Sequence, residues 1–75
     1  MKGKKVGEIL LPLRKGLQLH PSVTMDEKII NAIEMMLNNN VKDIAVVRNG
    51  RPIGMANLED ALRILGLHGS FEKQE

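Results

Sequence analysis

The sequence lacks cysteine and has almost no aromatic residues. Of its 75 residues none is cysteine, and Phe71 is the single aromatic side chain. The first absence excludes a disulfide framework and a thiolate metal site. The second removes the aromatic platforms on which nucleic-acid bases stack. His20 and His68 stand far apart without suitably spaced carboxylates, so we expect no metal site either.

Long apolar runs are also missing. No segment approaches the ~20 apolar residues of a membrane-spanning helix, and no signal-peptide pattern is present. We therefore expect a cytoplasmic protein with no membrane insertion. Part of the net charge of +2 lies in a basic N-terminal segment, residues 1–5. Such a segment can bind nucleic acid, but this mild charge excess favours a solvated chain end, and we expect no nucleic-acid partner.

The length allows one domain, residues 1–75, with an aliphatic and Met-rich core. A chain of this size buries only about two thirds of the surface that its unfolded form exposes, so its own stability is modest. Because no disulfide is available, association with another chain is the remaining source of stability.

The clearest predicted element is a helix over residues 27–39. Its apolar residues cover roughly 160°, which is wider than the ~100° stripe of an ordinary surface helix. The excess indicates either a partner chain or a deeper groove within the same chain, and we favour the partner. We expect the interface to comprise Ile30, Ile33, Met36 and Leu37. A capping box of Thr24 and Glu27, or Asp26 as the N-cap, would start the helix, and the asparagines at 38–40 would end it.

A β-hairpin follows this helix. Residues 44–47 are four consecutive apolar residues, which is typical of a strand buried on both faces. Asn49 and Gly50 form the strongest two-residue hairpin signal, and residues 51–56 form the return strand. Gly54 in that strand permits close approach of another backbone or a ligand.

Shorter elements complete an α+β pattern with the helices on one face of a small sheet. We expect one or two helical turns over residues 5–11, a linker or weak strand over 13–21, and a strand over 22–24. A second helix over 58–65 has Asn57 as its N-cap and Gly66 as its stop. The tail 68–75 is polar apart from Phe71.

The junction of the return strand and the second helix is the candidate site. Asn57 and Asp60 lie there beside unpaired backbone N–H groups, where a ribose or a phosphate could bind. The alternative is that Asn57 only caps the helix and Asp60 only complements its dipole. Ser22, Thr24 and Ser70 have no histidine at a recognisable spacing to activate them, so we expect no catalytic residues and no enzyme.

Residues 23–63 resemble a cystathionine-β-synthase (CBS) motif. We take residues 23–65 as the core motif of the domain. The resemblance rests on IINAIEMMLNNNV, on DIAVVRNGRPIGMAN with its Asn-Gly turn and Gly54, and on KVGEILLP before the motif. CBS motifs occur in pairs as Bateman-type modules, and this chain has one. The resemblance therefore implies a homodimer, and two such dimers could stack.

The resemblance also implies a ligand, AMP, ADP, ATP or a related adenosyl compound, in the cleft between subunits. Asp60 would hold the ribose diol, and Asn57 replaces the usual hydroxyl residue. Met55 and Ile44 would line the cleft, with Ala45 in place of a common proline. The protein would then regulate an enzyme, transporter or channel and require no cofactor. The alternative is a structural docking module that binds no nucleotide.

Overall fold

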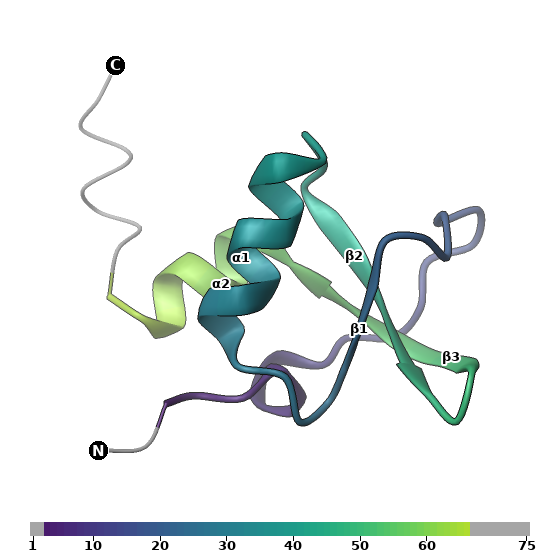
Figure 1. Ribbon diagram of the computed structural model, residues 1–75, viewed down its shortest axis with the longest axis horizontal. Coiled ribbons are helices and arrows are strands. Elements are labelled where there is room, and N and C mark those ends of the chain that lie inside the picture. Colours follow the sequence, from purple (N-terminus) through teal and green to yellow (C-terminus); the bar gives the residue numbers. More distant parts are fainter. Residues whose placement is uncertain (1–2, 67–75) are drawn as a thin grey trace.

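The computed structural model describes residues 3–66 of the chain, and it has the expected α+β architecture (Figure 1). A three-stranded sheet carries two α-helices on one face. The predictions for the polar tail, including Phe71, lie outside the described residues. In chain order the elements are the 3-10 helix η1 (Val6–Ile9), β1 (Ser22–Thr24), α1 (Ile29–Asn38), β2 (Asp43–Arg48), β3 (Arg51–Asn57) and α2 (Leu58–Ile64).

The sheet has the order β1-β2-β3, so the apolar strand β2 lies in the middle. β1 runs parallel to β2, and β3 runs antiparallel to it. Ile44, Ala45 and Val46 are all buried. This agrees with the expectation from four consecutive apolar residues, since a central strand covered on both faces has no polar side.

The hairpin turn has the predicted geometry. Asn49 and Gly50 have φ angles of 54° and 80°, as a type I′ turn requires at both central positions. Past the turn the register shifts between Val46 and Val47, so that Gly54 faces Val46 and Pro52 faces Val47. The intervening Ile53 has no partner in the ladder, as in a β-bulge.

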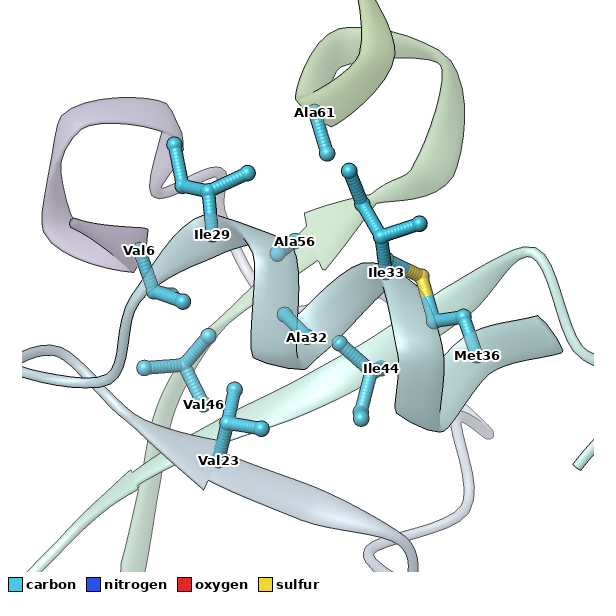
Figure 2. Close-up of a cluster of buried hydrophobic side chains, with 10 residues drawn as sticks. All are labelled: Val6, Val23, Ile29, Ala32, Ile33, Met36, Ile44, Val46, Ala56 and Ala61. Atoms are coloured by element: carbon cyan, nitrogen blue, oxygen red, sulfur yellow. The ribbon is translucent and has the colours of Figure 1, made fainter. Parts of the chain in front are cut away.

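The core lies between the sheet and the two helices and is entirely aliphatic apart from one methionine (Figure 2). Ile33 and Met36 belong to it, which corrects their assignment to a partner interface. Ile44, one of the predicted ligand residues, also belongs to it. The cluster consists of Val6, Val23, Ile29, Ala32, Ile33, Met36, Ile44, Val46, Ala56 and Ala61.

Helix α1 begins two residues later than predicted, and the expected capping box is absent. Lys28 is the N-cap and makes no side-chain cap bond. The reason is that the preceding turn bonds to the segment around η1. The Val6 N–H donates to the Glu27 carbonyl at 2.9 Å, and the Ile29 N–H donates to the Lys4 carbonyl at 2.8 Å. The helix ends as predicted, with Asn40 at a φ of 58°.

An arm formed by residues 10–21 connects η1 to β1 and first runs beside β3. Leu11 and Met55 exchange two backbone hydrogen bonds of 2.9 Å. Gly54 makes this approach possible, because a Cβ atom there would lie 2.6 Å from the Leu11 carbonyl oxygen. The close backbone approach predicted for Gly54 is therefore confirmed, and the approaching segment is the chain's own arm.

Candidate ligand-binding groove

The junction of β3 and α2 is organised by Asn57. This residue ends β3 and is the N-cap of α2, where its Oδ1 accepts the Asp60 backbone N–H at 3.1 Å. The cap predicted from the sequence is thus confirmed. The Asn57 amide also donates through Nδ2 to Asp43 Oδ1 at 3.0 Å. Asp43 and Asn57 are in-register partners on adjacent strands, so their side chains share one face of the sheet.

Arg14 of the arm completes this polar network. Its Nη1 donates to Asp43 Oδ2 at 2.7 Å. The Asp43 side chain is 15% exposed and that of Arg14 is 54% exposed. The hydrogen bond from Arg14 holds the pKa of Asp43 below its usual range, and the Asn57 amide acts in the same direction, although burial opposes both. Asp43 is therefore ionised at neutral pH.

Beside this network lies a groove of about 290 Å³, bounded on one side by the arm and on the other by the segment that enters β2. Arg14, His20 and Lys42 contribute basic or imidazole groups to its lining, and Asp43 contributes a carboxylate. Guanidinium and ammonium groups are the usual protein partners of phosphate. The groove therefore has the chemistry to hold an anionic ligand.

The carboxylate of Asp60 lies apart from the polar network of Asn57, Asp43 and Arg14. Its Oδ1 accepts a hydrogen bond from Arg63 Nη1 at 2.9 Å. Asp60 and Arg63 line a second groove of about 430 Å³, which η1 and the start of the arm form with α2. The structure brings Asn57 and Asp60 together through the Asp60 backbone, while the Asp60 carboxylate faces Arg63.

The other predicted ligand residues divide between the two faces of the sheet. Met55 and Ala45 are in-register partners. Because side chains alternate along a strand, they lie on the face opposite Ile44. Met55 is half-buried and Ala45 is fully buried. Asp43 and Arg14 were missed from the sequence, because they are 29 residues apart and only the folding of the arm joins them. An acidic residue at the start of a buried strand was the available signal.

Two of the four predicted interface residues are exposed. Ile30 is 49% and Leu37 is 57% exposed, and their spacing of seven residues places both on one edge of α1. Ile33 and Met36 are covered by the protein's own core. The wide apolar arc of this helix therefore has a covered part and an open edge.

Metal and membrane sites can be assessed only for residues 3–66. Within this range no three His, Asp or Glu side chains gather as metal ligands would. None of the helices there is long and apolar enough to cross a bilayer.

The described residues thus form a small sheet with helices on one face and a capped helix start beside a polar groove. The family model of the CBS domain matches residues 6–67. The chain therefore belongs to the CBS-domain family, whose members are in general regulatory or ligand-binding modules rather than catalytic ones.

One similar solved structure is the CBS domain of a CBS domain containing membrane protein from Sphaerobacter thermophilus. The sequences are 24% identical, and the TM-score is 0.58. The match covers 67% of this chain and 31% of the Sphaerobacter chain. The similarity therefore spans under a third of the length of the Sphaerobacter protein chain. This likeness concerns the fold alone. No curated protein matches the chain.

Proposed function

We propose that the protein forms a homodimer and binds an adenine nucleotide, AMP, ADP or ATP, in the cleft between its two subunits. The observation that carries this proposal is the groove beside Arg14, Lys42 and Asp43. It adjoins the β3–α2 junction, where the CBS resemblance implies a ligand. Binding would then modulate a partner protein, an enzyme, transporter or channel, through a change in shape or association.

The size of the groove supports a shared site. Pockets for small molecules usually have about 300–1,000 Å³ and enclose most of their ligand. At about 290 Å³, one groove lies just below this range. A second copy facing it would supply the remaining walls, which is the arrangement expected of paired CBS motifs.

The exposed edge of α1 supports dimerisation. Ile30 and Leu37 expose about half of their surfaces, and burying a large aliphatic side chain contributes about 1.5–3 kcal/mol. Symmetry doubles each contact in a dimer. These residues are the part of the predicted interface that a partner can still cover.

Asp60 is the proposed ribose ligand. Its backbone N–H bonds to Asn57 beside the Arg14 groove, and its carboxylate would turn from Arg63 and the second groove to reach a ribose there. A carboxylate accepts two hydrogen bonds from a cis-diol. Asp60 now accepts from Arg63, whose side chain is half exposed, so exchanging this surface pair for a diol costs little. Asn57 would act by holding the helix start, and the half-buried Met55 would lie beneath the adenine. Its strand partner Ala45 is fully buried and would support Met55 from β2.

The decisive experiment is thermal unfolding with AMP, ADP and ATP at millimolar concentration, combined with sedimentation of the same samples. A ligand that binds only the native dimer stabilises it by ~2.7 kcal/mol at a hundredfold excess over Kd. We expect a rise in Tm of several degrees, absent in Asp60→Ala. Glu59→Ala is the matched control, because Glu59 also pairs with Arg63 from the same helical turn. Nucleotide-independent melting of the wild type would refute the proposal.

A docking module without nucleotide binding is the second candidate. It is favoured by one observation: Asn57 and Asp60 already have protein partners, Asp43 and Arg63. This candidate gives a stable dimer whose Tm is indifferent to every nucleotide and to Asp60→Ala. The same melting experiment therefore separates the two functions.

A further inference from the structure

We propose that Arg14 selects phosphorylated ligands over neutral nucleosides in the groove, and that Asp43 is the positioning residue that holds its guanidinium there. The inference rests on the proposed function, since it names the group by which that same groove recognises its ligand. It goes further by assigning recognition to the arm, a part of the chain outside the predicted site.

Arg14 is held in place at both its backbone and its side chain. Its carbonyl accepts the Leu17 N–H at 3.1 Å, and three residues earlier the arm is bonded to β3 through Leu11. At the other end, Nη1 donates to Asp43 at 2.7 Å. Asp43 is itself held by the Asn57 amide at 3.0 Å. A side chain fixed in this way loses little conformational freedom when a ligand binds.

The guanidinium keeps donors for a ligand. Within residues 3–66, the bond to Asp43 is the only side-chain hydrogen bond that Arg14 makes, and 54% of the side chain is exposed. A guanidinium carries five N–H donors in a planar fork that matches phosphate oxygens two at a time. The donors not used by Asp43 can therefore bind a phosphate in the adjoining groove.

Lys42 borders the same groove but is less suited to selection. Its ammonium is a strongly hydrated point charge on a flexible stem, and it makes no ion pair within the described residues. Together Arg14 and Lys42 outweigh the charge of Asp43, so the groove attracts anions. The carboxylate of Asp43 repels phosphate locally, so the phosphate is expected on the guanidinium edge remote from Asp43.

The test is calorimetric titration of the full chain with AMP and adenosine. Charged hydrogen bonds contribute about 1.5–3 kcal/mol, which corresponds to roughly tenfold or more in Kd. We expect Arg14→Gln to weaken AMP binding by at least about tenfold and to leave adenosine binding unchanged. Arg14→Lys should recover only part of the AMP preference, because it keeps the charge and loses the fork. Lys15→Gln is the control, since this neighbouring basic residue does not line the groove.

The role of Asp43 is tested by Asp43→Glu, which keeps the charge and moves the carboxylate by one methylene. We expect a lower ratio of AMP to adenosine affinity, with adenosine affinity retained. A structural role alone would weaken both ligands equally. Equal effects on both would therefore contradict the positioning role.

Failure of this inference is distinguishable from failure of the proposed function. If AMP and adenosine bind equally well, or Arg14→Gln leaves their ratio unchanged, the inference is overturned and adenine binding stands. If neither binds, the proposed function fails, and inorganic tripolyphosphate becomes the probe. If tripolyphosphate binds and Arg14→Gln abolishes this binding, Arg14 is still supported as the anion-binding residue. If tripolyphosphate does not bind, the proposed role of Arg14 is overturned.

Discussion

Asp43 is the residue at which three separate parts of the chain meet. It begins β2. Its carboxylate accepts one hydrogen bond from Arg14 of the arm and another from Asn57 at the end of β3. Asn57 in turn caps α2 through the Asp60 N–H. A hydrogen-bonded series therefore runs from the arm to the second helix, and the state of one carboxylate affects both ends.

The pH dependence of stability follows from this carboxylate. Its pKa in the folded protein is lowered, chiefly by the hydrogen bond from Arg14. A lowered pKa means that Asp43 stabilises the fold above its unfolded-state pKa of about 3.9, and that this contribution disappears as pH falls through the folded-state value. We expect Asp43→Asn to reduce the free energy of unfolding at pH 7 by about 1 kcal/mol or less, since Arg14 is half exposed.

Denaturant unfolding of both proteins from pH 7 to pH 2 measures this effect. The difference between wild type and Asp43→Asn should shrink below about pH 4. Arg14→Gln should show the same trend, because it removes the main cause of the shift. A difference that stays constant down to pH 2 would mean that the ion pair contributes nothing in solution.

At the scale of elements, local sequence signals predicted some element boundaries and failed at one. The hairpin and the start of α2 were predictable from local signals, an Asn-Gly turn and an Asn cap. The start of α1 was not, because Glu27 and Ile29 bond to the segment around η1. Local sequence carries no information about such a distant partner.

Gly54→Ala tests the contact between the arm and β3. The new Cβ atom would lie 2.6 Å from the Leu11 carbonyl oxygen and 2.7 Å from Leu10 Cδ1. Since a backbone atom cannot move aside alone, the arm must shift. We expect the free energy of unfolding to fall by about 1–3 kcal/mol. Thermal unfolding should show this as a decrease in Tm of at least about 4 °C.

Gly7→Ala is the matched control for this substitution. A Cβ atom there would approach Met25 no closer than 3.6 Å, which is ordinary contact. Its Tm should therefore stay near that of the wild type. Equal Tm values for the two variants would contradict the close approach of the arm to β3.

At the scale of the whole molecule, the exposed edge of α1 is the proposed dimer interface. A domain of this size has little core, and Ile30 and Leu37 remain about half exposed on its surface. Pairing through this edge would bury them and bring two grooves into one assembly. Dimerisation and ligand binding would then be linked, since each stabilises the other.

Leu37→Lys tests this interface by placing a charge at its proposed centre. We expect sedimentation to show a dimer for the wild type and an increase in its dissociation constant of at least about tenfold for the variant. Asn38→Lys adds the same charge to the adjacent, outward position of the helix and should leave the dimer intact. Identical behaviour of the two variants would exclude this edge of α1 as the interface.

The sequence by itself determined the order of the elements, the hairpin, the Asn57 cap and the aliphatic core. These depend on turn residues, side-chain period and local capping, all of which act within a few positions of the chain. Only the tertiary structure decided that Ile33, Met36 and Ile44 are internal, that the Asp60 carboxylate faces Arg63, and that Arg14 meets Asp43. Burial and ion pairing at those positions depend on segments that are distant in sequence, and folding alone brings them together.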